Sequence, residues 1–286
     1  MTVLDRRLNA YRADLADRRL EGSVAAARYA DGQPRQIVAP VADLRSAPSA
    51  DAGLDTQLLL SDAVAVFDEA DGWAWVQSPH DGYVGYVAGA DIGLPGDPPT
   101  HRVAAPRTIL YREPDMKRPA SRALSLGCAV RVVGETETRG TTYALLDTGE
   151  AAIEAHLLPA GNSATDFVAV AERLELTPYL WGGASAFGID CSGLVQLAMR
   201  MAGRAVLRDT DMQARSVGTE FPVGEDLDGL QRGDLVFWKG HVGIMTDAEN
   251  LIHANGHSMM VSREPLREAV ERIGYLYGRP TGFRRP

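Results

Sequence analysis

Apolar residues near the start of the chain recur at the spacing of a helix. Four of them stand 4, 3 and 4 positions apart, with charged residues at most positions between them: Leu4, Leu8, Tyr11 and Leu15. Because positions three and four apart share one face of a helix, this pattern predicts an amphipathic helix over residues 3–20. We expect this helix to act as a strap on a later domain, within an N-terminal helical extension of residues 1–36.

Between residues 37 and 160, short β-branched and aromatic runs alternate with turns rich in Gly, Asp and Pro. This texture is typical of small all-β domains. A shift of the chain by 66 residues superimposes many positions, among them Leu44 with Leu110, Pro48 with Pro114, and Ala63 with Ala129. A constant offset indicates a tandem repeat. The sequence therefore predicts two small β-barrel modules, over residues 37–93 and 102–160.

The pattern changes again after residue 163. Apolar residues at helical spacing predict helices near 167–174 and over 191–202, on either side of a Gly-rich turn. Apolar and β-branched runs then predict the following elements: strands at 234–238, 242–245, 251–254 and 259–261, a short helix near 264–272, and a strand near 274–277. Helices followed by consecutive strands indicate an α+β domain with an antiparallel sheet over residues 163–286.

Composition and charge exclude several classes of protein. Apolar residues make up 45% of the chain and charged residues 23%, which argues against wholesale disorder. A net charge of −9 is a poor match for the phosphates of nucleic acids or for anionic membranes. No apolar run approaches the length of a membrane span. We therefore expect no nucleic-acid partner and no membrane association, and the oligomeric state is not readable from the sequence.

The N-terminus and the cysteine count bear on the cellular compartment. The first residues lack the charged start and apolar core of a signal peptide, so we expect none. Two cysteines, Cys128 and Cys191, cannot form a disulfide framework. Both observations favour a cytoplasmic protein. We interpret Cys128 as a packing or turn residue of the second module.

Candidate chemistry centres on Cys191, within Gly188-Ile-Asp-Cys-Ser-Gly193 at the start of a predicted helix. Unpaired N–H groups and the helix dipole at such a position favour a thiolate. His241 and His253 stand on consecutive predicted strands and can be neighbours if those strands pair, which would give a nucleophile, a base and an orienting residue. All three could instead be structural or hold zinc, although no Cys-x-x-Cys pair accompanies them. We expect no metal and no other cofactor.

Motifs over residues 165–280 occur in the same order as those of a known family. They are Pro178-Tyr-Leu-Trp-Gly-Gly183, Gly188-Ile-Asp-Cys-Ser-Gly193, Arg208-Asp-Thr-Asp-Met-Gln213, Arg232-Gly-Asp-Leu-Val-Phe-Trp238, His241-Val-Gly-Ile244 and Ile252-His-Ala254. This segment resembles the NlpC family of papain-like cell-wall peptidases. The two preceding modules then resemble bacterial SH3-like domains, an arrangement similar to that of γ-D-glutamyl-L-diamino acid endopeptidases. The resemblance implies a papain-like α+β catalytic domain preceded by two SH3-like barrels.

The resemblance also implies roles for individual residues. Cys191 would be the nucleophile, His241 the base and His253 the orienting residue. Six further positions match substrate-binding residues: Tyr83, Trp181, Asp190, Ser192, Asp209 and Thr210.

Several of these binding positions have a structural alternative. Trp181 would line the pocket or else lie in the core. Asp190 would meet the free amine of the substrate or else cap the helix. Tyr83 would reach the active site from the first module or else be a cross-strand aromatic of the barrel. Thr210 stands where the family has Ser, so its hydroxyl is kept and a methyl is added. Arg208 and Gln213 are expected to be structural.

The function implied by the resemblance is that of a cytoplasmic cysteine endopeptidase in murein peptide recycling. Its partner would be a short peptide with a free N-terminal L-Ala, cleaved between D-Glu and the diamino acid. Three alternatives stay open: an inert peptidoglycan-binding protein, an exported wall hydrolase, and an acyltransferase with the same Cys–His chemistry.

Overall fold

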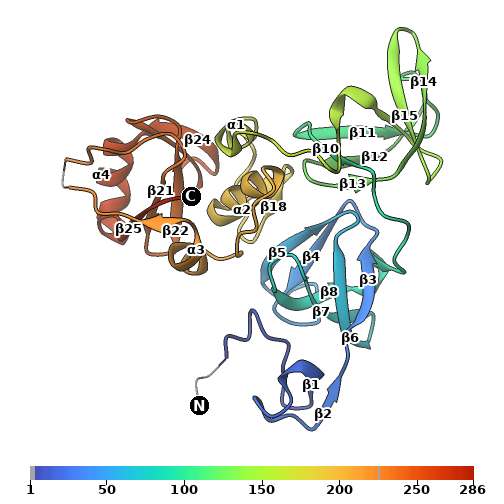
Figure 1. Cartoon of the computed structure of the whole chain (residues 1–286), viewed down its shortest axis with the longest axis horizontal. Coiled ribbons are helices and arrows are strands. Elements are labelled where there is room, and N and C mark those ends of the chain that lie inside the picture. The colour runs from blue at the N-terminus through green and yellow to red at the C-terminus, as the bar shows by residue number, and fades with distance from the viewer. Residues whose placement is uncertain (1–3, 225) are drawn as a thin grey trace. The chain divides into compact units, whose positions relative to one another are not determined.

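The computed structural model describes residues 4–224 and 226–286 (Figure 1). The chain divides into two compact units, the first ending at Asn162 and the second comprising Ser163–Pro286. Strands dominate the first unit, whereas the second combines four helices with a sheet of six strands. Within the described residues, no helix combines the length and the apolar character that crossing a membrane requires.

The prediction of an N-terminal helix is wrong: the described residues 4–36 form no α-helix. Their regular elements are β1 (Leu15–Asp17), the 3₁₀ turn Arg18–Leu20 and β2 (Arg28–Ala30). Asp5 and Asp17 each accept a hydrogen bond of 2.9 Å from the backbone N–H two residues further on. Such turns compete with the helix for the backbone donors.

The four apolar residues that predicted the helix are buried or half-buried without one. Leu15 and Ala10 pack with Phe67 and Trp75 of the following module. The backbone also bonds to that module, because the N–H of Val84 donates to the carbonyl of Arg7 at 2.8 Å. The segment therefore gains from the module the burial and the hydrogen bonding that the prediction assigned to a helix.

The first β module forms one sheet of seven strands in the order β5-β4-β8-β7-β6-β3-β9. Its strands are β3 (Gln33–Ile37), β4 (Val41–Arg45), β5 (Leu54–Leu59), β6 (Ala63–Ala70), β7 (Trp73–Gln77), β8 (Val84–Ala88) and β9 (Ile92–Gly93), with the 3₁₀ turn Gly89–Asp91 before the last. Alternate residues are buried along β8 and along the first half of β6.

The second β module repeats this topology. Its strands are β10 (His101–Val103), β11 (Arg107–Tyr111), β12 (Ala120–Ser125), β13 (Ala129–Val130), β14 (Val132–Thr138), β15 (Thr141–Leu146), β16 (Ala151–Ile153) and β17 (Leu157–Pro159), with the 3₁₀ turn Glu154–His156 before the last. The order β12-β11-β16-β15-β14 mirrors β5-β4-β8-β7-β6, and β13-β10-β17 mirrors β6-β3-β9. The repeat in the sequence is thus also a repeat of strand order.

Cys128 lies where the two modules meet. Its side chain is fully buried, and its sulfur is 3.2 Å from the carbonyl oxygen of Pro40 in the first module. The N–H of the next residue, Ala129, donates to the carbonyl of Leu60 at 3.1 Å. These contacts match the packing role expected for Cys128.

The second unit is built on a sheet in the order β20-β25-β21-β22-β23-β24. Its strands are β20 (Thr219–Glu220), β21 (Leu235–Trp238), β22 (His241–Met245), β23 (Asn250–Asn255), β24 (Met260–Pro265) and β25 (Gly282–Arg285). Every pairing in this sheet is antiparallel, as expected. The remaining elements are α1 (Phe167–Glu172), the short pair β18 (Ala184–Ser185) and β19 (Gly188–Ile189), α2 (Cys191–Met201), α3 (Thr210–Ser216) and α4 (Leu266–Tyr277).

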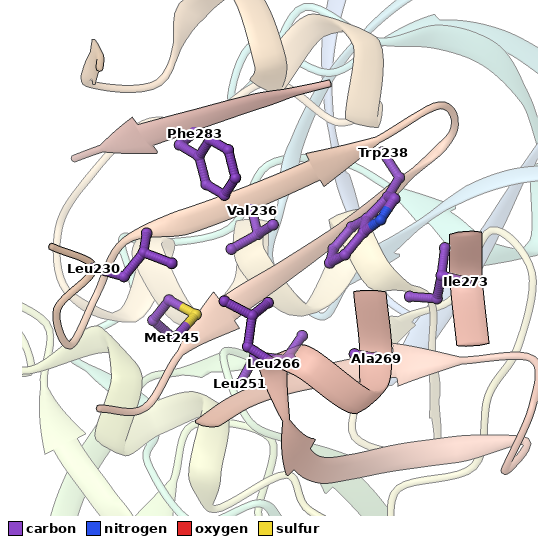
Figure 2. Packing of buried hydrophobic residues seen from close by; sticks show 9 residues of the cluster. All are labelled: Leu230, Val236, Trp238, Met245, Leu251, Leu266, Ala269, Ile273 and Phe283. Carbon is purple, nitrogen blue, oxygen red and sulfur yellow. The ribbon is translucent and has the colours of Figure 1, made fainter. Parts of the chain in front are cut away.

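One face of this sheet packs against α4 (Figure 2). The cluster consists of Leu230, Val236, Trp238, Met245, Leu251, Leu266, Ala269, Ile273 and Phe283. Side chains two apart along a strand share a face. His253, two residues after Leu251 on β23, therefore stands on the face that α4 covers.

Two local predictions in this unit differ from the structure. The strand near 274–277 is wrong, because these residues extend α4, which ends at Gly278 with a φ of 81°. The apolar run that suggested a strand, Tyr275, Leu276 and Tyr277, is exposed on the last turn of that helix. Helix α3 had no predicted counterpart.

Candidate active site

The nucleophile candidate stands at the first position of α2. Asp190 caps this helix with an extended backbone, and its side chain accepts from the N–H of Gly193 at 2.7 Å. A Cβ on Gly193 would lie 2.3 Å from the carbonyl oxygen of Gly183, so only glycine lets the Gly-rich loop approach the helix start. The motif around Cys191 therefore has a local structural reason as well as a chemical one.

Cys191 is buried, with 6% of its surface exposed. The hydroxyl of Thr210, at the start of α3, lies 3.8 Å from its sulfur. The backbone N–H of Val242 donates toward the same sulfur, which places Cys191 beside the beginning of β22. Burial, and secondarily the charge of Asp190, raise the pKa of the thiol to about 11. The thiol of Cys191 is therefore neutral at neutral pH, contrary to the thiolate expected from the helix start alone.

His241 and His253 are hydrogen-bonded to each other. The Nε2 of His241 is 2.8 Å from the Nδ1 of His253, and the ring centroids are 5.0 Å apart. The register pairs Ile244 with Ile252, so His253 faces Gly243 and lies diagonally from His241. A Cβ on Gly243 would lie 2.3 Å from Cδ1 of Leu251 and 3.6 Å from Cβ of His253. Glycine at this position leaves room for Leu251, which stands two residues before His253 on β23.

The electrostatics keep His241 neutral. Burial lowers its pKa to about 3, the charge of Arg272 acts in the same direction, as would a charge on His253, and Glu264 opposes it. His241 opens β22 next to Val242, whose N–H reaches the sulfur, and a neutral imidazole can accept the proton of a neutral thiol as sulfur attacks a carbonyl. Cys191, His241 and His253 thus provide the parts of a nucleophilic site, and the roles that the resemblance implies for them stay a prediction.

Asp190 and Ser192 belong to a buried network around Arg208. The guanidinium donates to both carboxylate oxygens of Asp190, at 2.9 and 2.7 Å, and to the hydroxyl of Ser192 at 2.8 Å. The N–H of Gly182 donates to the same carboxylate at 2.9 Å. With the cap bond to Gly193, these donors occupy the acceptor positions of a carboxylate. Asp190 is therefore the helix cap, and its contact with a substrate amine stays a prediction.

The remaining expected binding residues lie in different surroundings. The side chain of Trp181 is 73% exposed, which excludes the core alternative. Asp209 is half-buried at the N-cap position of α3, next to the buried Thr210 that contacts Cys191. Tyr83 is buried in the first unit, and its approach to the site stays a prediction.

The expected structural role of Gln213 and Arg208 agrees with their surroundings. Gln213 is fully buried, and its Nε2 donates to the carbonyl oxygens of Ser192, Leu207 and Arg208 at 3.0, 2.9 and 3.3 Å. These bonds tie the segment before α3 to the first turn of α2. They hold Thr210 close to the nucleophile.

One candidate residue, Tyr179, was missed because its motif was treated only as a family signature. Burial raises the pKa of its phenol, and the negative charges of Cys191 and Asp190 contribute. Tyr179 is therefore close enough to the nucleophile to respond to its charge, and it keeps its proton at neutral pH. A protonated phenol here can donate to negative charge that develops during attack. A polar aromatic residue two positions before the Gly-rich turn was the available signal.

The described residues offer no resident metal site. Within residues 4–224 and 226–286, no three side chains of His, Cys, Asp or Glu gather in an arrangement that could hold an ion. The facing ring nitrogens of His241 and His253 are instead hydrogen-bonded to each other.

Two segments match models of protein families. Residues 176–274 match the NlpC/P60 family, and residues 44–92 match the bacterial dipeptidyl-peptidase SH3 domain. Among curated proteins, the chain is 28% identical over 274 residues to dipeptidyl-peptidase 6 of Lysinibacillus sphaericus, covering 84% of this chain and 98% of that protein. It is 27% identical over 243 residues to the gamma-D-glutamyl-L-lysine dipeptidyl-peptidase of Bacillus cereus, covering 74% and 71%.

A solved structure shares the fold. An NlpC/P60 family protein from Bacillus cereus superimposes with a TM-score of 0.72 at 23% identity, covering 88% of this chain and 99% of that one. The chain thus combines an NlpC/P60 domain with a bacterial SH3 domain, and its catalytic unit is that of a cysteine peptidase.

Proposed function

We propose that this NlpC/P60 cysteine peptidase hydrolyses the bond between γ-D-Glu and the diamino acid in short murein peptides that begin with a free L-Ala. The observation that carries the proposal is Cys191 at the start of α2, beside a strand that presents His241 hydrogen-bonded to His253. The names of two relatives, dipeptidyl-peptidase 6 and gamma-D-glutamyl-L-lysine dipeptidyl-peptidase, point to this substrate class.

The proposed reaction proceeds through an acyl-enzyme. His241 takes the proton of the Cys191 thiol while the sulfur attacks the γ-carbonyl carbon of D-Glu. The backbone N–H of Cys191, among those without a partner inside the helix, and the phenol of Tyr179 face the negative charge on the carbonyl oxygen. The C–N bond then breaks as His241 gives the proton to the leaving amine, and water hydrolyses the thioester.

Recognition of the free amino terminus is assigned to carboxylates near the nucleophile. Arg208 already balances the charge of Asp190, so we assign the larger share to Asp209, whose neighbour Thr210 contacts Cys191. Tyr83 of the SH3 module and Trp181 would wall the same end of the pocket.

The decisive experiment compares L-Ala-γ-D-Glu-diaminopimelate with the same peptide acetylated on alanine. Because a charge-assisted bond contributes about 1.5–3 kcal/mol, acetylation should lower kcat/KM by about tenfold or more. Asp209→Asn should reduce that preference, whereas Asp211→Asn should not, since Asp211 forms an exposed pair with Arg215 at 2.6 Å. Equal rates on both peptides would favour a hydrolase of polymeric murein, and products capped by an added amine would reveal acyl transfer.

A role in peptide recycling within the cytoplasm completes the proposal. Small free peptides of this kind are what a recycling enzyme receives. Cell fractionation followed by immunodetection of the protein is the test, and recovery of the protein in the medium or at the wall would contradict it.

A further inference from the structure

Behind the two histidines lies a carboxylate that the catalytic scheme does not use. Oε1 of Glu264 is 2.7 Å from Nε2 of His253, whose side chain is fully buried. Glu264 stands on β24 opposite Leu251, so it shares with His253 the face of the sheet that α4 covers. Arg272 of α4 donates from its Nη2 to the same oxygen.

We propose that Glu264, held in place by Arg272, is a positioning residue that fixes which ring nitrogens of His253 and His241 carry protons. This inference rests on the cysteine peptidase chemistry of the site and not on the choice of substrate.

The argument follows the hydrogen bonds from Glu264 toward the nucleophile. An ionised carboxylate only accepts hydrogen bonds, so the Nε2 of His253 must carry the proton in their shared bond. In neutral His253 the Nδ1 is then an acceptor, and the Nε2 of His241 must donate across the 2.8 Å contact. Neutral His241 is left with an unprotonated Nδ1. That atom is the base available to Cys191.

Glu264 is ionised under the conditions where this chain of bonds must operate. Partial burial favours the neutral acid, but the hydrogen bonds from His253 and Arg272 prevail and lower the pKa of the Glu264 carboxyl. Its ordinary value is already well below neutrality, so a carboxylate faces His253 at neutral pH. Arg272 balances its charge, so Glu264 acts mainly by directing protons and only weakly by making His241 more basic.

The opposite tautomer shows what Glu264 prevents. If His253 carried its proton on Nδ1, the Nε2 of His241 would have to accept, and its Nδ1 would carry the proton. His241 could then not take a proton from Cys191 at that nitrogen. Only a fixed acceptor on the far side of His253 removes this inactive arrangement.

The test combines Glu264→Gln, His253→Ala and the double variant. A glutamine can turn its amide and donate to His253, so both tautomers become available in Glu264→Gln. We expect kcat to fall by about tenfold or more, with KM changed less than about twofold. In the wrong tautomer the Nδ1 of His241 is protonated and cannot act as a base, but the residues that bind substrate are unchanged. In the His253→Ala background, the same substitution should change kcat by less than about twofold. Glu268→Gln, on the exposed first turn of α4, is the matched control and should leave kcat unchanged.

A measurement on the unmodified protein keeps the inference falsifiable if the variants fold poorly. Nitrogen-15 NMR of the histidine rings should show protons on Nε2 of both His253 and His241 at neutral pH. A proton on Nδ1 of His253 would overturn the proposal, as would an equal loss of kcat from Glu264→Gln with and without His253. If γ-D-glutamyl peptides are not cleaved at all, the proposed substrate fails, while the NMR result still decides the role of Glu264.

Discussion

Arg208 donates two hydrogen bonds to the carboxylate of Asp190, and the arginine is almost entirely buried. The pair joins the cap of the nucleophile's helix to the segment that leads into α3. Because Asp190 already serves two backbone donors and this arginine, a change at Asp190 disturbs the helix start itself. An Asp190 variant therefore changes the helix start together with any contact that Asp190 makes with a substrate amine.

We expect Asp190→Asn to lower the free energy of unfolding by about 3–5 kcal/mol, because it leaves a buried guanidinium without its counter-charge. Urea denaturation monitored by circular dichroism measures this. The comparison is Asp211→Asn, whose exposed pair with Arg215 should change stability by about 0.5 kcal/mol or less. Similar small losses in both variants would show that Arg208 does not depend on Asp190.

Replacing the two cysteines should separate catalysis from packing. Cys191→Ala should abolish turnover with the fold retained, since the thiol supplies the attacking sulfur. Cys128→Ala should leave kcat unchanged and cost about 1 kcal/mol of stability, since Cys128 is fully buried at the junction of the β modules. Peptide hydrolysis and thermal melting are the two measurements. Residual activity in Cys191→Ala would exclude the mechanism.

The pH dependence should report a neutral thiol and a neutral imidazole. With the pKa of Cys191 raised from 9.0 to about 11, alkylation by iodoacetamide should accelerate mainly as the pH rises above 9.0. With the pKa of His241 lowered from 6.5 to about 3, the acid limb of kcat/KM should lie below 6.5. A fast, pH-independent alkylation between about pH 5 and 7 would instead reveal a thiolate–imidazolium pair.

Gly243→Ala tests the space that Leu251 needs beside the histidine pair. The new methyl would press on Leu251 and approach His253, so we expect a loss of about 1–3 kcal/mol in stability and a lower kcat. Gly256→Ala is the control, because a Cβ at Gly256 would meet nothing within 4 Å. Unchanged kcat and stability in Gly243→Ala would mean that the pairing of His241 with His253 tolerates a bulkier strand position.

Removal of metal ions should have no effect on the rate. Since no metal-binding cluster exists among residues 4–224 and 226–286, incubation with EDTA followed by dialysis should leave kcat/KM within error of the untreated enzyme. Activity that disappears with EDTA and returns with added zinc would revive the metal interpretation of Cys191, His241 and His253.

Local patterns sufficed for the framework of the catalytic unit. The run that becomes α2 has helical spacing from its first residue, and the strands bearing His241 and His253 are short β-branched runs joined by tight turns. Consecutive antiparallel strands bring such residues together without further information. The proximity of the two histidines therefore followed from the order of the elements.

Contacts between distant residues left no comparable trace in the sequence. Arg208 and Asp190 are 18 positions apart, and Glu264 meets His253 across 11, with nothing local to distinguish them from surface charges. The helix prediction for the first segment was wrong for a related reason. Leu15 packs against Phe67 and Trp75 of the following module, and this burial does not require a helix. Tyr275 and its neighbours have strand propensity, but they form the last turn of α4, where their side chains are exposed to solvent and do not pack against a sheet.

The position of β25 has a consequence for the order in which the protein can be made. This strand inserts between β20 and β21, and its Phe283 belongs to the cluster beneath α4. During synthesis, Cys191 and both histidines leave the ribosome before the strand that closes their sheet. Until β25 has been synthesised, the backbone N–H and C=O groups on one edge of β21 have no partner strand. Strand β21 consists of four apolar residues, and its free edge can pair with another chain. Interrupted translation would therefore release an aggregation-prone fragment that contains Cys191, His241 and His253 but has an incomplete hydrophobic core.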